Sequence, residues 1–322
     1  MGKKNSIPPG SSFTFEVLSE DPVRLDKFIH EKFPDYSRNY FQRMIEHELV
    51  TVNNHVAHKA GLALKEGDMV TVSFPEKRKL AVREIKEFPV NFDLIFQGPH
   101  FLIINKPAGL LVHPTTAFDK EVTLVDILVS RFPQLLDIGY AERPGIVHRL
   151  DKHTSGLMVI PFSNYAHTVF GRLFRDREIK KTYLAVVQGH PPKEGTIDLP
   201  IGRSIIDRKK MATFTHQKAR EHNKKIRESK THYKVLEYFD DAALVEAKPV
   251  TGRTHQIRIH FASIGHPLLA DVVYGKESKL IGRQALHAYR LQFVFDDEPF
   301  DFIAEPPKDF QELLISLRHE KR

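Results

Sequence analysis

Residues 144–157 read PGIVHRLDKHTSGL and hold the highest density of reactive side chains in the chain. Two histidines, an arginine, an aspartate and two hydroxyls fall within eight residues, and an apolar strand pattern follows at 156–161. A loop held by a rigid strand is a common way to present catalytic groups. Asp151 could act there as a nucleophile or as a general base. The same residues could instead form a turn whose side chains satisfy backbone donors.

Strand patterns outnumber helical patterns on both sides of this segment. From residue 91 onward, short apolar or alternating runs occur at 101–104, 181–188, 231–238, 243–247 and 291–295, and longer helical patterns are fewer, at 122–131, 163–175 and 309–318. This balance predicts an α+β domain over residues 91–322, built on a central, mainly antiparallel sheet.

Residues 15–75 predict a smaller α/β module of their own. Helical spacing over 25–33 indicates one helix, and Ser37 can cap a second. Short strand patterns with turn signals follow these helices. We expect residues 1–14 to form a disordered tail, and residues 76–90, which are charged, to form a linker.

The composition narrows the class of protein. The 322 residues include no Cys, which excludes a cysteine nucleophile, a thiolate zinc site and a disulfide framework. This composition fits a reducing compartment, and we expect a cytoplasmic protein. No apolar run approaches the roughly 18 residues of a membrane span. The 18 histidines include no His-Glu-x-x-His pattern, so we expect no catalytic metal.

The basic surplus of the chain is local. The 48 Lys and Arg against 41 Asp and Glu give a net charge of +7, and residues 203–230, with ten basic and three acidic residues, carry the same net charge. Such a patch suggests a polyanionic partner, although a solvated surface insertion would have the same composition. Arg220, Lys224 and Arg227 have helical spacing, so both a basic helix and a disordered arm are consistent with the sequence.

Five segments, taken in order, resemble the RluA family of RNA pseudouridine synthases. The run HRLDKHTSG matches the signature of that family, and it is accompanied by NKPAGLLVHP at 105–114, KTYLAVVQG at 181–189, TGRTHQIRIH at 251–260 and GHPLLADVVYG at 265–275. Residues 15–75 resemble the S4 RNA-binding domain through the order of their elements and the runs LVTVNN and KEGDMVTV. The chain departs from the family at Ala270, where glycine is usual.

The resemblance implies an isomerase that needs no cofactor, metal or nucleotide triphosphate. Such an enzyme detaches uracil from ribose at N1, rotates the base and rejoins it through C5. Asp151 is the implied catalytic carboxylate, which attacks the sugar C1′, adds to the base or acts through a glycal intermediate. Structured RNA is the implied partner, with ribosomal RNA favoured over transfer RNA, and we expect a monomer.

The resemblance also nominates two partners for Asp151. Arg258 would keep the carboxylate ionised against the effect of burial, and a guanidinium can bind both carboxylate oxygens. Tyr183 would stack on the reacting base or move a proton. Alternation of polar and apolar residues over 256–261 is typical of a strand, so Arg253 and Arg258 should point to opposite faces.

Binding roles fall on further basic residues. Because a uridine in folded RNA must be flipped out, Arg149 is implied to enter the gap or to hold the backbone. His148 is a weaker binding candidate, because a single histidine in such a segment is more often structural. The remaining predicted RNA contacts are Arg253, Arg38 and Arg43 of the S4-like module, and Lys224, Lys225 and Arg227 of the basic segment.

Two other functions stay open at this level. The chain could be an RNA-binding protein of the same fold without activity. It could also be an aspartate-dependent glycoside hydrolase, a class that normally needs two carboxylates across the scissile bond. The motifs supply one aspartate among basic groups, which suits an anionic substrate better.

Overall fold

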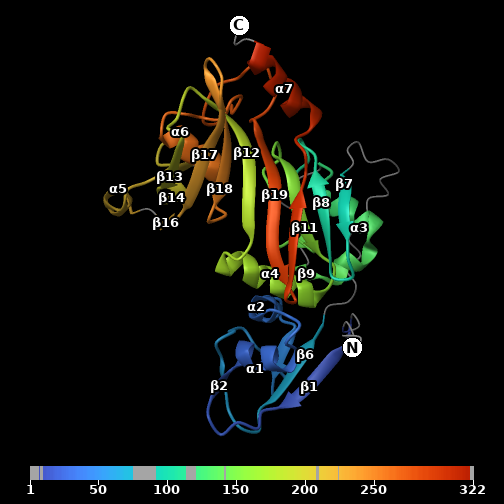
Figure 1. Cartoon of the computed structure of the whole chain (residues 1–322). Helices are drawn as coiled ribbons and strands as arrows, with labels where there is room; N and C mark the ends of the chain where they lie inside the picture. The colour runs from blue at the N-terminus through green and yellow to red at the C-terminus, as the bar shows by residue number, and fades with distance from the viewer. Residues whose placement is uncertain are drawn as a thin grey trace.

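The chain forms a small N-terminal unit and a larger unit built on one long sheet (Figure 1). The computed structural model describes residues 7, 10–74, 92–113, 121–140, 143–207, 210–223 and 225–319. The predicted linker at 76–90 and Lys224 lie outside these described residues. No helix within the described ranges is long and apolar enough to cross a membrane.

The N-terminal unit packs two helices on a small antiparallel sheet of order β1-β6-β3-β4. Its elements are β1 (Ser12–Glu16), β2 (Val23–Arg24), α1 (Leu25–Lys32), α2 (Arg38–Glu46), β3 (Val50–Val52), β4 (His55–Val56), β5 (Ala63–Leu64) and β6 (Met69–Ser73). Ser37 caps α2 as predicted, because its Oγ accepts the Tyr40 N–H at 3.2 Å. The predicted disordered tail is wrong for residues 12–14, which pair with β6 as part of β1.

The larger unit is organised by a nine-stranded sheet of order β13-β17-β18-β12-β19-β11-β8-β7, with β20 beside β19. Its strands are β7 (Asp93–Gln97), β8 (Phe101–Lys106), β11 (Ser155–Pro161), β12 (Lys180–Gln188), β13 (Glu194–Asp198), β17 (Lys230–Tyr238), β18 (Ala242–Pro249), β19 (Leu286–Phe295) and β20 (Glu298–Ile303). Every pair is antiparallel except β11 with β19, so the prediction of an α+β fold on a mainly antiparallel sheet is confirmed.

Gly156 makes the parallel pairing of β11 and β19 possible. Its φ is 120°, and a Cβ at this position would lie 2.3 Å from the Ala288 carbonyl oxygen. Only glycine tolerates both this backbone conformation and this approach. The glycine that closes the signature segment therefore lets the loop before β11 reach the centre of the sheet.

Helices cover both faces of this sheet. Because successive side chains of a strand point to opposite faces, alternate residues pack against different helices. The helices are α3 (Leu124–Arg131), α4 (Asn164–Asp176), α6 (Gln256–Ser263) and α7 (Lys308–His319), with a short 3₁₀ turn at Pro133–Asp137 and a small ribbon of β9 (Gly139–Tyr140) and β10 (Arg143–Pro144). Leu102 and Ile104 pack in the cluster that holds α3, whereas Phe101 and Ile103 pack in the cluster that holds α4. Along β12, Ala185 and Val187 pack with α6, and Leu184 and Val186 pack with α7.

The described part of the basic segment 203–230 folds as a small sheet with one short helix, so neither a basic helix through Arg220 and Arg227 nor a disordered arm describes it. It includes the end of β14 (Ile201–Arg203), β15 (Met211–Thr213), α5 (His216–Glu221) and β16 (Ile226–Arg227), and β14 pairs with both other strands. The helical spacing of its basic residues was therefore misleading. Thr215 caps α5, the helix ends after six residues, and Asn223 follows with φ of 46°.

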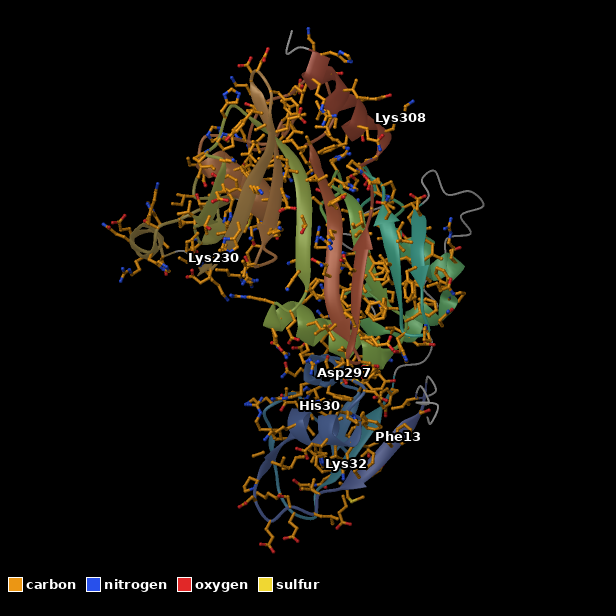
Figure 2. The ribbon with its side chains drawn as sticks, viewed as in Figure 1. Phe13, His30, Lys32, Lys230, Asp297 and Lys308 are labelled. Atoms are coloured by element: carbon orange, nitrogen blue, oxygen red, sulfur yellow. The ribbon has the colours of Figure 1, made fainter. Side chains whose placement is uncertain are left out.

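Two separate apolar cores support the predicted division of the chain. The N-terminal core includes Phe28, Phe41 and Val70, and no residue of the large sheet belongs to it. The units meet near α4, where Thr168 Oγ1 donates to the Asp35 carbonyl at 3.0 Å, and the β19–β20 turn with Asp297 lies on the same side (Figure 2). The boundaries 15–75, 76–90 and 91–322 stay a prediction.

Candidate active site

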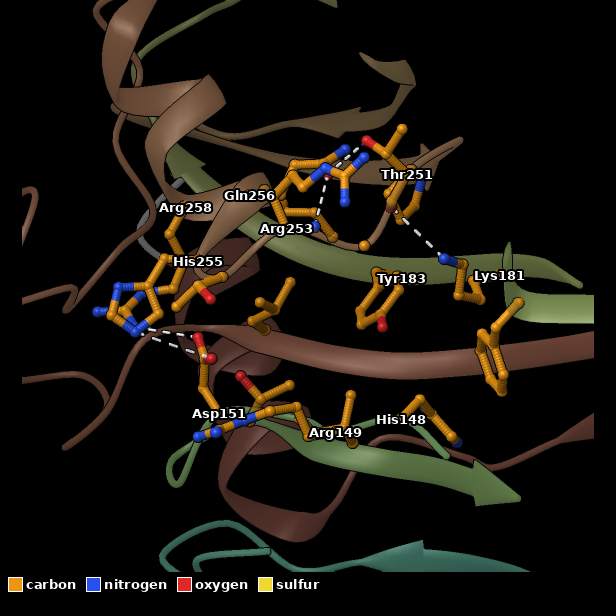
Figure 3. A pocket seen from close by; sticks show the side chains of 18 of the residues that line it. His148, Arg149, Asp151, Lys181, Tyr183, Thr251, Arg253, His255, Gln256 and Arg258 are labelled. Carbon is orange, nitrogen blue, oxygen red and sulfur yellow. Dashed lines mark hydrogen bonds and ion pairs between the residues drawn. The ribbon is translucent and has the colours of Figure 1, made fainter. Parts of the chain in front are cut away.

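A cavity of about 360 Å³ opens on the sheet face that carries α3 and α6. Its walls are the loop 146–151 before β11, Lys181 and Tyr183 of β12, and residues 249–258 between β18 and α6 (Figure 3). Four of the motifs identified in the sequence therefore meet around one space, because His113 of the 105–114 motif also lines it. The volume falls within the roughly 300–1,000 Å³ of small-molecule sites.

Asp151 and Arg258 form an ion pair at one end of this cavity. Arg258 Nη1 donates to Asp151 Oδ2 at 3.0 Å, and the two side chains are 6% and 21% exposed. The guanidinium does not bind both oxygens of Asp151, because its Nε and Nη2 donate to Asp271 at 2.7 and 2.8 Å. Burial lowers the pKa of Arg258, but its hydrogen bonds and charge interactions with Asp271 and Asp151 raise it above the usual range. Arg258 is therefore a permanent cation.

Arg258 lies on a helix, so the predicted strand over 256–261 is wrong. The alternating pattern does not mark a solvent face, because all six residues are buried. The polar members are satisfied inside the protein: Gln256 Nε2 donates to the Lys230 carbonyl at 2.9 Å, and His260 Nδ1 lies 2.9 Å from Thr231 Oγ1. Tertiary contacts thus outweigh the local pattern.

The helical geometry also changes the position of Arg253. The two arginines were expected to point apart, yet both Arg253 and Arg258 line the same cavity. Arg253 Nε donates to the Glu228 carbonyl at 3.1 Å, which ties this wall to the basic segment. A phosphate-binding role for Arg253 stays a prediction.

Tyr183 and Lys181 supply the β12 wall of the cavity. Tyr183 packs against apolar side chains of both clusters on this sheet face, between α3 and α6. Burial and, second, the charge of Asp151 raise the pKa of Tyr183 above its usual range. Burial lowers the pKa of Lys181 to about 8, and its Nζ donates to the Thr251 carbonyl at 3.4 Å.

The two basic residues before Asp151 have different environments. Arg149 is exposed, and its Nη1 lies 3.4 Å from His113 Nε2. His148 instead accepts the Val159 N–H at 3.0 Å through Nε2 and stacks on Phe174 with ring centroids 4.5 Å apart. Burial lowers the pKa of His148 to about 3, so its ring is neutral. Arg149 is thus available to a ligand, whereas His148 is anchored to the protein.

Two family models match this chain, in the order that the motifs predicted. The model described as RNA pseudouridylate synthase matches residues 100–263, just over half of the chain, and includes Asp151, Tyr183 and Arg258. The chain belongs to the RNA pseudouridylate synthase family. The model described as S4 domain matches residues 23–70 of this pseudouridylate synthase. The family resemblance of both units is confirmed.

Similar proteins extend this match over nearly the whole synthase. The chain is 36% identical over 321 residues to the ribosomal large subunit pseudouridine synthase D of Zymomonas mobilis, covering 95% of this chain and 98% of the relative. Its identity to the Escherichia coli protein of the same name is 35%, covering 94% and 93% of the two chains. The solved structure of human RNA pseudouridylate synthase domain containing 1 has 27% identity and a TM-score of 0.56, covering 72% of this chain and 98% of that one.

The predicted RNA-binding residues outside the cavity lie in two places. Arg38 and Arg43 are on α2, and Arg38 Nη2 donates to the fully buried Asp26 at 2.8 Å. Lys225 and Arg227 are exposed near β16 of the basic segment. None of these four residues lies in the wall of the cavity.

Sequence reasoning missed several residues that surround Asp151. His255 Nε2 lies 3.8 Å from Asp151 Oδ1, and its Nδ1 lies 2.9 Å from the Tyr274 hydroxyl. Tyr274 also places its ring under Arg258, with 5.2 Å between the guanidinium carbon and the ring centroid. The motifs contained all three of His255, Asp271 and Tyr274, but their spacing gave no sign of these contacts.

Proposed function

We propose that this synthase isomerises uridines of large-subunit ribosomal RNA to pseudouridine, with Asp151 as the catalytic carboxylate. The observation that carries the proposal is the Asp151–Arg258 pair at the end of a nucleoside-sized cavity lined by Tyr183. Relatives named ribosomal large subunit pseudouridine synthase D support the choice of RNA. In the reaction the N1–C1′ bond breaks, a C5–C1′ bond forms, C5 loses its proton and N1 gains one.

Asp151 can take its part in this reaction because it faces the Arg258 cation and is still accessible. One hydrogen bond from Arg258 holds Oδ2, and the side chain keeps 21% exposure toward the cavity. Attack on C1′, addition to the base and a glycal intermediate all start from this carboxylate. The proposal therefore concerns the identity of the catalytic group and leaves the three routes open.

Tyr183 is proposed to hold the uracil ring and to act with a protonated hydroxyl. Its raised pKa keeps the phenol neutral over the physiological range, so it donates rather than serves as a phenolate base. Its place in the wall beside Asp151 suits stacking on a base. This role combines the two functions that the resemblance implied.

A cavity of this size admits one nucleoside and not a helix, so the target must be flipped out of its RNA. Arg149, exposed at the edge of the cavity, is proposed to fill the gap or to hold the RNA backbone. His148 is better explained as an anchor of the loop, because one face of its ring stacks on Phe174 and its Nε2 accepts the Val159 N–H.

Pseudouridine mapping tests the proposal. Ribosomal and transfer RNA would be mapped from cells without the gene, and again after complementation with the wild type or with Asp151→Asn, which keeps the side-chain size. We expect large-subunit sites to require the gene and the wild-type carboxylate. If pseudouridine is lost from transfer RNA alone, transfer RNA and not ribosomal RNA is the substrate. Modification restored fully by Asp151→Asn would remove Asp151 from the mechanism, and no loss at all would favour the inactive RNA-binding alternative.

We also infer that the synthase is a cytoplasmic monomer. The absence of Cys is consistent with a reducing compartment. Light scattering of the purified protein, with and without RNA, tests the monomer.

A further inference from the structure

Asp271 has no access to solvent, yet it lies one side chain away from the catalytic carboxylate. Its Oδ2 accepts Arg258 Nε at 2.7 Å, and its Oδ1 accepts Arg258 Nη2 at 2.8 Å. The backbone N–H groups of Val273 and Tyr274 add two hydrogen bonds to Oδ1, at 3.0 and 3.2 Å. The turn after Ala270 thus fixes Asp271, and Asp271 fixes the guanidinium.

One guanidinium therefore serves two carboxylates in unequal ways. Asp271 occupies the Nε–Nη2 edge of Arg258 in a two-bonded arrangement, which is the strong geometry for such a pair. Asp151 receives the single remaining contact, from Nη1 at 3.0 Å. The ring of Tyr274 lies against the guanidinium and restricts its rotation. The three charged groups together carry a net charge of −1.

This arrangement affects the reactivity of Asp151. A carboxylate held by both arms of a guanidinium would be strongly stabilised in its ionised form, and its lone pairs would be directed at N–H groups. Because the Nε–Nη2 edge of Arg258 faces Asp271, Asp151 Oδ1 accepts no hydrogen bond from Arg258 and stays open to substrate, with His255 Nε2 at 3.8 Å. We propose that Asp271 is a positioning residue: it holds Arg258 so that Asp151 is bound by one guanidinium contact only and stays reactive. This inference rests on the proposed function of Asp151.

Other charged or titratable groups also face Asp151. His255 approaches from the start of α6, Tyr183 from β12 and Tyr274 from the turn after Asp271. Lys106 at the end of β8 interacts with the Asp151 charge, and Lys152 and Arg149 flank it in its own loop. All of them are retained in the variants below, so a change in the pH profile reports on Asp271.

The decisive variant is Asp271→Asn, which keeps the size of the side chain and removes its charge. The amide N–H₂ group of the new asparagine cannot accept a hydrogen bond from Arg258. We therefore expect the guanidinium to rotate and to donate from two nitrogens to Asp151. The single-turnover rate at saturating enzyme should fall at least about tenfold. The acid limb of the pH–rate profile should move to lower pH, because Arg258 would hold the Asp151 carboxylate more strongly. The dissociation constant for RNA should change by less than about twofold.

Matched variants separate this effect from loss of structure. Asp301→Asn makes the same change at an exposed pair with Arg290 on β19 and should leave rate and profile unchanged. Asp271→Glu keeps the charge but displaces the carboxylate. The maximal single-turnover rate in the pH–rate profile should therefore fall, while the acid limb stays at the wild-type pH. If circular dichroism shows that the Asp271→Asn variant is unfolded, the Asp271→Glu variant alone decides. A maximal rate equal to that of the wild type, or a shifted acid limb, would then overturn the proposal.

The outcomes also separate this inference from the proposed function. A wild type that forms no pseudouridine in its RNA refutes the function itself. An active wild type whose Asp271→Asn variant keeps its rate, or whose acid limb stays or moves to higher pH, refutes only the role of Asp271.

Discussion

The Nζ of Lys106 donates a hydrogen bond to the carbonyl oxygen of Lys152 at 3.2 Å, which joins the end of β8 to the residue after Asp151. Lys106 is fully buried, and its Nζ also donates to the carbonyls of Pro107 at 2.7 Å and Leu110 at 2.9 Å. The Lys152 carbonyl accepts a second hydrogen bond, from the Gly109 N–H at 2.8 Å. The loop after β8 therefore supports the loop that presents Asp151.

Replacing Lys106 with Met should destabilise the synthase and slow its chemistry. The change keeps an unbranched chain but removes the ammonium group that donates to three carbonyl oxygens, of which the Lys152 carbonyl keeps the Gly109 N–H. We expect a loss of about 2–4 kcal/mol in the free energy of unfolding, measured in urea. The single-turnover rate should fall while RNA affinity is kept. Lys308→Met on α7, where the lysine is 88% exposed, is the control. Equal stability of the two variants would show that the three contacts contribute little.

Removing the hydroxyl of Tyr183 should reduce the rate without weakening RNA binding. Tyr183→Phe keeps the ring that packs in the cavity wall. It deletes the hydroxyl, which is the only group of this side chain that can transfer a proton. We expect the single-turnover rate to fall by about 10²-fold at an unchanged dissociation constant. Tyr233→Phe, in the buried side of β17, serves as the control. A Tyr183→Phe rate within about twofold of wild type would restrict this residue to stacking.

The motif resemblance predicted three of the residues that meet in the cavity. Asp151, Tyr183 and Arg258 come from motifs spread over more than a hundred residues of the chain, and the family match explains why they converge. Ser37 as a helix cap was predictable from local chemistry alone, because the cap depends on one hydroxyl and the next turn. The antiparallel sheet followed from many short strand patterns.

The sequence did not predict how Arg258 is used. The alternation of polar and apolar residues over 256–261 indicated a strand, because such a pattern is interpreted on the assumption that the polar residues face solvent. In this helix all six residues are buried, so the assumption fails. The two-bonded partnership with Asp271 depends on a buried turn in which Ala270 has φ of 58°, a conformation that alanine disfavours. Lys106 was missed for a similar reason, since a buried lysine is recognised only from the carbonyls around it.

Buried histidines should make the synthase less stable in mild acid. Burial lowers the pKa of His148 to about 3 and those of His167 and His287 to about 4. In the unfolded chain each has a pKa near 6.5, so between pH 6.5 and about 4 the unfolded state binds more protons and stability falls as pH falls. Urea midpoints at about pH 7 and about pH 5 should differ in that direction.

A pair of histidine variants locates this pH effect. His287→Gln keeps a polar group near Ser155 and should reduce the difference between the two midpoints. His216→Gln, at a side chain 64% exposed, should leave the difference intact. An undiminished difference in His287→Gln would assign the acid sensitivity to other groups.

Lys225 and Arg227 should contribute to RNA affinity through charge alone. Both are exposed in the basic segment, outside the residues that line the active-site cavity. Each neutralised phosphate contact removes about 0.7–0.9 from the slope of log affinity against log salt concentration, so Lys225→Gln with Arg227→Gln should flatten the slope by roughly 1.4–1.8. Lys308→Gln, at the far end of the larger unit from the N-terminal unit (Figure 2), should leave the slope unchanged. The single-turnover rate at saturating enzyme should match the wild type in both, because neither change touches the cavity. An unchanged slope in the double variant would mean that the segment is a solvated insertion, and the +7 charge of residues 203–230 would then have no part in binding RNA.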